Sequence, residues 1–89
     1  MPVLSVFYGL IIRMYAEGGG KHHTPHIHVI YQNEEYQFDF DGNELNGKTL
    51  VPQKKKLLDA WLVLHRDDLT ANWTLLSSGE PAFKIEPLR

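Results

Sequence analysis

The spacing of the hydrophobic residues changes near Pro52, and this change limits the chain to few folds. Between residues 27 and 41, apolar and polar side chains alternate with a period of two, which is typical of strands with one buried face. After Pro52, apolar residues recur at steps of three and four, which is typical of a helix packed on a core. Strands that come first and helices that follow predict an α+β domain.

The first half of the chain is expected to form a small antiparallel sheet of three to four strands. One strand is predicted from Phe7 to Tyr15, where Ile, Tyr and Phe are frequent. The next two strands, 27–31 and 36–41, would be joined by a hairpin loop over 32–35. A short fourth strand is expected over 44–50.

Two C-terminal helices are expected to cover one face of this sheet. Pro52 suits the first position of the first helix, because its fixed φ is helical and no N–H is needed there. Asp67 or Asp68 is expected to cap the second helix, and Gly79 would end it. The apolar tail over 82–89 is expected to dock on the core, for example as an edge strand.

The length of 89 residues predicts one domain, residues 1–89. The apolar fraction of 43% suffices for a core, and the lack of cysteine excludes disulfides and thiolate metal ligands. No apolar run is long enough to span a bilayer, and the N-terminus lacks the layout of a secretion signal. The sequence therefore predicts a cytoplasmic protein without membrane contact.

The formal net charge of −2 argues against a general electrostatic attraction to nucleic acid. The run Lys54-Lys55-Lys56, with Lys48 before it, is the local exception. Such a run is usually a solvated helix face, and a nucleic acid or another acidic partner is the alternative.

Four of the five histidines lie within seven residues and carry most of the chemical information. Imidazole titrates near neutral pH and is the commonest metal ligand. If the hairpin loop spans residues 32–35, His28 lies opposite Asp39. The same register places His26 opposite Asp41, with all four side chains on one polar face.

Three uses of these histidines are consistent with the pattern. A metal site would combine two imidazoles from the strand with one from the preceding loop, or with an aspartate, around Zn²⁺, Ni²⁺ or Mn²⁺. Acid–base catalysis would use a histidine held by a carboxylate, for example to cleave RNA or another phosphodiester. In the third use the histidines only satisfy the hairpin on a solvated face. The candidate metal ligands are His22, His26 and His28, and the candidate catalytic residues are His26, His28, Asp39 and Asp41.

Four further residues are judged by their neighbours. Arg13 lies among apolar residues and is expected to have an acidic partner, because an unpaired buried guanidinium is costly. His65 lies on the apolar face of the first predicted helix, and it is expected to be a hydrogen-bonded core or boundary residue. Trp61 and Trp73 are expected to anchor the core.

Several segments spread over nearly the whole chain share a pattern with known proteins. They are Phe7-Tyr8-Gly9-Leu10-Ile11-Ile12-Arg13-Met14-Tyr15, His22 with Pro25-His26-Ile27-His28-Val29, Ala60-Trp61, His65, Leu69, Asn72-Trp73 and Phe83-Lys84-Ile85-Glu86-Pro87-Leu88. The chain resembles a family of small bacterial proteins known as domain of unknown function four-one-six-zero. The most specific part of the resemblance is the string His-x-x-Pro-His-Ile-His, in which family members often have a proline where this chain has Thr24.

The family has no settled activity, but its genes often neighbour those of another small family, and such pairs have been proposed as toxin–antitoxin modules. The resemblance thus implies one component of a two-gene toxin–antitoxin or regulatory pair, whose partner protein is encoded by an adjacent gene. Two alternatives are a small histidine-dependent phosphodiesterase or RNase-like enzyme and a divalent-metal-binding protein. The sequence decides neither whether the chain is an enzyme nor whether it forms homo-oligomers.

Overall fold

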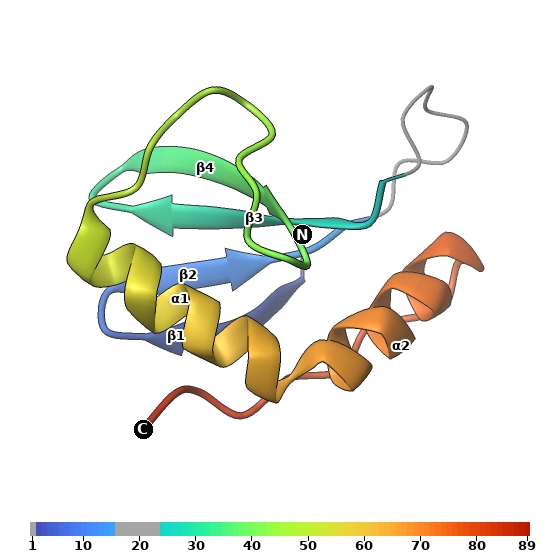
Figure 1. The fold of residues 1–89 in the computed structure, drawn as a ribbon. Helices are drawn as coiled ribbons and strands as arrows, with labels where there is room; N and C mark the ends of the chain where they lie inside the picture. Colours follow the sequence, from blue (N-terminus) through green and yellow to red (C-terminus); the bar gives the residue numbers. More distant parts are fainter. Residues whose placement is uncertain (1, 16–23) are drawn as a thin grey trace.

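A computed structural model describes residues 2–15 and 24–89 of the chain. These residues form a four-stranded antiparallel sheet in the order β1-β2-β3-β4, followed by two helices. The elements are β1 (Val3–Phe7), β2 (Leu10–Arg13), β3 (His26–Tyr31), β4 (Glu34–Asp39), α1 (Pro52–Leu64) and α2 (Arg66–Ser77). α1 crosses one face of the sheet, and α2 continues beyond the end of the sheet where β2 stops (Figure 1). The predicted α+β fold is confirmed.

The core lies between α1 and the face of the sheet that α1 covers (Figure 1). Its members include Leu10, Ile12, Ile27, Val29 and Phe38 from the sheet and Leu58, Trp61, Leu62 and Leu69 from the helices. Successive side chains of a strand point to opposite faces. Because Ile27 and Val29 point into the core, His26 and His28 belong to the opposite face, which the helices leave open.

The chain reverses at Tyr8 and Gly9, so the single strand predicted from Phe7 to Tyr15 is wrong. Both turn residues have positive φ, 49° and 81°, as a two-residue hairpin turn requires. Phe7 pairs with Leu10 on either side of this turn. The reversal is not evident from the sequence, because the apolar and aromatic run continues through it and Gly9 is the only typical turn residue there.

The segment over 44–50 does not form the predicted fourth strand, because it makes a single bridge between Phe38 and Glu44. Instead, the side chain of Asn46 follows the outer edge of β4. Its amide oxygen accepts from the backbone N–H of Gln37, and its amide nitrogen donates to the Glu35 carbonyl. One side chain thus satisfies backbone groups that a further strand would have paired.

The two helices begin differently from one another. Pro52 occupies the first turn of α1, as predicted. The residue before α2 is His65, whose side chain makes no capping bond, so the predicted cap by Asp67 or Asp68 is wrong. Both aspartates lie in the first turn instead, where their charges interact favourably with the helix dipole.

Neither described helix has the length and apolar character needed to cross a membrane.

Gly79 ends α2, as predicted, through two backbone hydrogen bonds. Its N–H donates to the Leu76 carbonyl, and the N–H of Glu80 donates to the Leu75 carbonyl. This pair of bonds needs a left-handed residue, and Gly79 supplies it with a φ of 79°.

Two buried side chains hold the C-terminal tail on the helices. Asn72 donates to the Phe83 carbonyl at 2.9 Å and accepts from the Phe83 N–H at 2.8 Å. The indole N–H of Trp61 donates to the Glu86 carbonyl at 2.8 Å. The tail therefore docks on the core as predicted, fixed mainly by side chains.

The tail does not form an edge strand. A single backbone hydrogen bond, from the Ile85 N–H to the Leu4 carbonyl, links it to β1. Ile85 is buried and adds one apolar side chain to the core.

Candidate histidine site

The turn between β3 and β4 sets the register of the site. Gln32 and Asn33 form this turn with positive φ values of 50° and 67°, and Tyr31 pairs with Glu34. The loop predicted over 32–35 is therefore wrong by two residues. A two-residue turn of this type follows the right-handed twist of the strands, which favours it over a longer loop.

The shorter turn pairs each histidine with the residue two positions earlier on β4 than predicted. His28 lies opposite Gln37 instead of Asp39, and His26 lies opposite Asp39 instead of Asp41. Both predicted histidine–aspartate pairs are thus wrong. A slip of one residue would have turned the histidines to the other face, whereas a slip of two keeps them on the predicted one.

Asp39 serves the turn that follows β4. One carboxylate oxygen accepts from the N–H groups of Asp41 and Asn43, both at 2.9 Å, and the other accepts from the Asn43 amide at 3.0 Å. Partial burial alone would raise the pKa of Asp39. The hydrogen bonds from Asn43 and from the turn backbone outweigh this effect and hold the pKa below its ordinary value of 3.8.

Asp41 has a different partner, because its exposed carboxylate pairs with Arg66 at the start of α2. This ion pair joins the turn after β4 to the helix. In the described residues, no hydrogen bond or ion pair connects Asp39 or Asp41 to an imidazole. Two of the four candidate catalytic residues thus have structural partners.

Tyr15 and Glu35 hold the buried ring of His28. The residue is only 3% exposed, and the Tyr15 ring stacks on its imidazole with a centroid distance of 4.2 Å. Nδ1 lies 3.2 Å from a carboxylate oxygen of Glu35 and 3.2 Å from the Tyr15 hydroxyl. Because an ionised carboxylate only accepts, we assign the proton to Nδ1. The buried Nε2 then has a lone pair that no group in the described residues satisfies.

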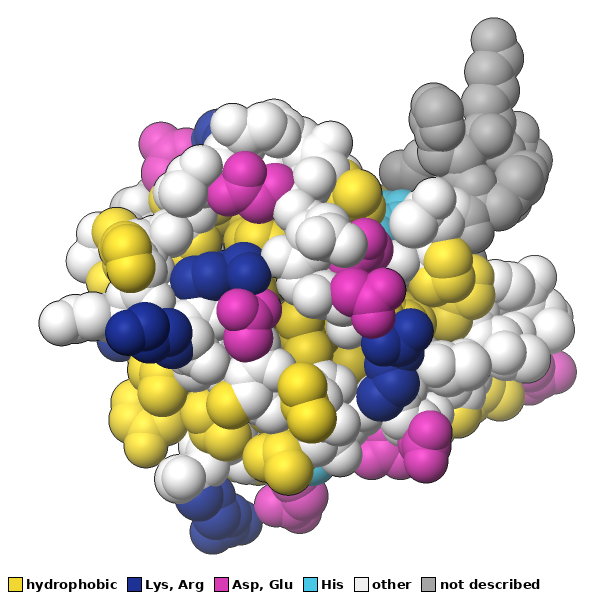
Figure 2. All heavy atoms as spheres, viewed as in Figure 1, with side chains coloured by type: hydrophobic (Ala, Val, Ile, Leu, Met, Phe, Trp, Pro, Cys, Tyr) yellow, Lys and Arg dark blue, Asp and Glu magenta, His cyan; other side chains and the backbone are white. Residues whose placement is uncertain are grey.

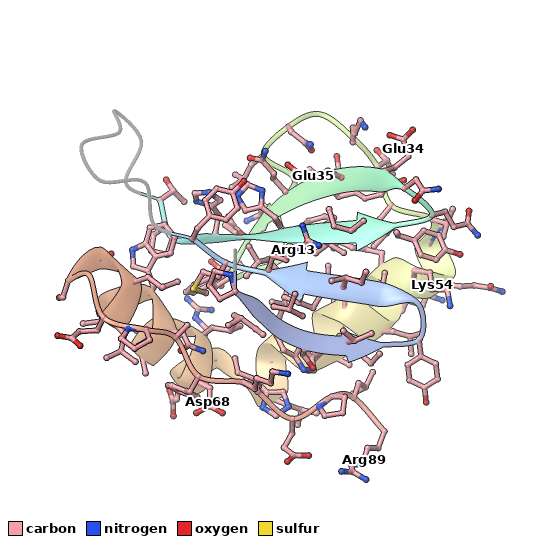
Figure 3. The ribbon with its side chains drawn as sticks, turned by 180° about the vertical axis from the view of Figure 1, so that it is seen from behind. Arg13, Glu34, Glu35, Lys54, Asp68 and Arg89 are labelled. Atoms are coloured by element: carbon pink, nitrogen blue, oxygen red, sulfur yellow. The ribbon has the colours of Figure 1, made fainter. Side chains whose placement is uncertain are left out.

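Glu35 is the acidic partner that the sequence analysis missed, because it was assigned to the hairpin loop. Gln37 also donates to its carboxylate, at 3.5 Å. Figure 3 shows Glu35 on β4, on the side of the sheet away from the helices. The signal was present in the alternation, since Glu35 continues the polar face formed by Gln37 and Asp39.

The ring of His26 is held by the backbone of Thr24. Its Nδ1 lies 2.8 Å from the Thr24 carbonyl, so Nδ1 carries the proton and Nε2 is the acceptor. The ring lies 5.2 Å from the His28 ring and 5.3 Å from the Trp73 indole. It also lines a surface hollow of about 270 Å³, whose lining residues are Thr24, His26, Gln37 and Leu45.

The predicted metal ligands are therefore placed in part. His26 and His28 lie side by side, and His22 lies outside the described residues. Within residues 2–15 and 24–89, no three histidine or carboxylate side chains are grouped so that they could hold a metal ion.

Arg13 adjoins the histidine pair, because it is the direct cross-strand partner of His28. Its Nε is buried, and no group in the described residues forms a hydrogen bond with it. No carboxylate in the described part of the chain forms an ion pair with it, contrary to prediction. Figure 3 shows Arg13 on the same open face as Glu35.

The lysine run makes intramolecular contacts. Lys54 donates to the Tyr8 carbonyl at 2.8 Å, and Lys55 pairs with Asp59 at 2.8 Å. On the face with the helices, acidic and basic side chains are interspersed (Figure 2). These contacts favour the solvated helix face over a nucleic-acid surface.

A family model described as "Domain of unknown function (DUF4160)" matches residues 9–74. The chain belongs to the DUF4160 family. The matched region of this DUF4160 protein includes Arg13, both histidines of the pair and Glu35. No curated protein matches the chain, and no solved structure matches it.

Proposed function

We propose that this DUF4160 protein binds a divalent metal ion, such as Zn²⁺, through Nε2 of His26 and Nε2 of His28. The support is the way in which both rings are held. His26 donates its Nδ1 proton to the Thr24 carbonyl, and His28 donates to Glu35. Histidines that ligate metals almost always donate their other N–H to such an oxygen, which fixes the tautomer and orients the ring.

The buried Nε2 of His28 is the observation that carries the proposal. An unsatisfied polar atom in the interior costs about 1–3 kcal/mol, and a metal ion would satisfy this one. The spacing of the rings is also compatible with a shared ion. Their centroids are 5.2 Å apart. Two imidazoles on one tetrahedral zinc ion, with Zn–N of about 2.0–2.1 Å, have centres roughly 5 Å apart.

Two histidines do not complete such a site. His22 remains the predicted third ligand, and water or a bound ligand would take the remaining positions. A ligand set of imidazoles without thiolates is typical of catalytic rather than structural zinc sites. A bound ion would supply Lewis acidity or a water of lowered pKa.

The geometry supports metal binding better than acid–base catalysis by the histidines alone. The Nε2 of His28 is buried, so a small ion fits beside it better than a substrate whose proton it would have to take. His26 is more accessible, but its Nδ1 is bound to a backbone carbonyl instead of a carboxylate. Asp39 and Asp41, the predicted carboxylates, serve the turn and α2.

Calorimetric titration of tag-free protein with Zn²⁺, Ni²⁺ and Mn²⁺ tests the proposal. We expect one equivalent to bind and to raise the melting temperature. His26→Ala should abolish both effects, because it removes one ligand near the end of β3. Glu35→Gln should weaken binding by about 10–100-fold, because it removes the carboxylate that orients His28.

His65→Ala is the matched control, since this imidazole packs on Trp61 at the junction of the helices. It should bind metal as the unmodified protein does. The proposal would be excluded by an unchanged melting temperature at saturating metal, or by a metal-induced rise that persists in His26→Ala.

A further inference from the structure

Arg13 presents an unsatisfied donor beside the proposed metal site. It pairs directly with His28 across β2 and β3, so the Cβ atoms of the two residues lie about 4.5–5.5 Å apart on one face. The Nε of Arg13 and the Nε2 of His28 are both buried, and no group among residues 2–15 and 24–89 bonds to either atom. Two unsatisfied polar atoms on one cross-strand pair favour a bound group that would complete both.

The charges around Arg13 indicate what this group is. A guanidinium stays protonated at any ordinary pH and can only donate. Glu35 does not neutralise it, because Glu35 lies across β3 and its carboxylate holds His28. A divalent cation on His28 would add a second positive charge next to Arg13. An anion in contact with both cations would satisfy the Nε–H and remove the repulsion.

We infer that Arg13 binds an oxyanion, a phosphate or carboxylate group, that also occupies an open position of the metal ion held by His26 and His28. The inference rests on the proposed function, and it names the class of ligand that the site takes. The planar guanidinium matches both groups, because its N–H donors form a fork that two oxygens can accept. The hollow beside His26 offers polar groups from Thr24 and Gln37 to the rest of such a ligand.

The test is the coupling between zinc and anion binding. Zinc affinity is measured by competition with a chromophoric chelator, with and without inorganic phosphate, and corrected for zinc bound by free phosphate. In the unmodified protein, phosphate should raise the zinc affinity by about tenfold, a typical coupling between two sites. Arg13→Gln should retain zinc binding without phosphate and lose the rise.

Two further variants make the test specific. Arg13→Lys keeps the charge and the aliphatic stem but loses the fork, so a reduced coupling is expected; it also serves if Arg13→Gln does not fold. Arg89→Gln is the control, because this exposed arginine pairs only with Glu86 in the tail. It should retain the full coupling.

Acetate and methyl phosphate identify the anion, since coupling with acetate alone indicates a carboxylate and coupling with methyl phosphate indicates a phosphoryl group. If zinc binds but no anion changes its affinity, or if the coupling survives in Arg13→Gln, the inference is overturned while the metal site stands. If zinc does not bind to the unmodified protein, both are overturned.

Discussion

Asn72 shows how much one buried polar side chain contributes to this fold. It is fully buried on α2, and its amide pairs with the N–H and the carbonyl of Phe83, as a neighbouring strand would do. The helical spacing of Leu69, Asn72 and Leu76 predicts that Asn72 faces inward, but it does not indicate the partner of this side chain. That partner lies in a segment without periodicity, where backbone pairing cannot be read from a pattern.

We expect Asn72→Ala to lower the free energy of unfolding by about 2–3 kcal/mol, because two buried backbone groups of Phe83 lose their partners. Urea denaturation followed by circular dichroism measures the change. Thr74→Ala, on the exposed face of the same helix, is the control and should stay within about 0.5 kcal/mol of the unmodified protein. A loss for Asn72→Ala no larger than that for Thr74→Ala would mean that the contact with Phe83 does not stabilise the fold.

At the scale of elements, the parts with strong periodicity were predictable and the parts that depend on turns were not. α1, α2 and the inner face of β3 follow from hydrophobic spacing. The hairpin turn at Tyr8 and Gly9 was missed, and the loop of the second hairpin was predicted two residues too long. Tyr8 and Gln32 both adopt a positive φ that such residues seldom take. The turn fixes the register, and the register decides the neighbours of His28. For this reason the sequence predicted the face of the site but missed Glu35 and the unpaired Arg13.

The turn after β4 makes stability depend on pH through Asp39. Its pKa is lower in the folded state than the ordinary value of 3.8, so its ionised form stabilises the fold. This contribution is complete above the unfolded pKa and is lost as the pH falls through the lower folded pKa. We expect Asp39→Asn to cost about 1 kcal/mol near pH 6, with the difference shrinking as the pH falls below 3.8.

Urea unfolding of both proteins between pH 2 and 7 measures this difference. Glu80→Gln is a suitable control, because Glu80 is an exposed carboxylate beyond α2. A difference for Asp39→Asn that stays constant down to pH 2 would show that the charge of Asp39 has no part in stabilising the turn.

At the scale of the whole molecule, the end of α1 exposes two adjacent apolar side chains, where we propose that a protein partner binds. Val63 and Leu64 at the end of α1 are 78% and 67% exposed, although neighbouring Leu62 is buried. Adjacent exposed apolar side chains are more frequent at protein interfaces than elsewhere on a surface. This end of α1 is separate in sequence from the histidine pair on β3, so metal binding and partner binding can be tested independently.

We predict that the chain co-purifies with the product of an adjacent gene when the two are co-expressed. The double variant Val63→Asp, Leu64→Asp should lose the partner and keep its zinc affinity. Glu80→Lys, an exposed charge change beyond α2, should retain the partner. Purification as a lone monomer in the presence of that product would contradict the prediction.

Because Trp73 contacts His26, the fluorescence of its indole would report a metal ion bound there. Indole fluorescence is quenched by paramagnetic ions a few ångströms away, and the two rings are 5.3 Å apart. Ni²⁺ bound at His26 would lower the fluorescence intensity of Trp73. The N–H of Trp61 is bonded to the tail, so release of the C-terminus would shift the emission of Trp61 to longer wavelength. Metal binding at His26 and release of the C-terminal tail can therefore be followed in one emission spectrum, without any label.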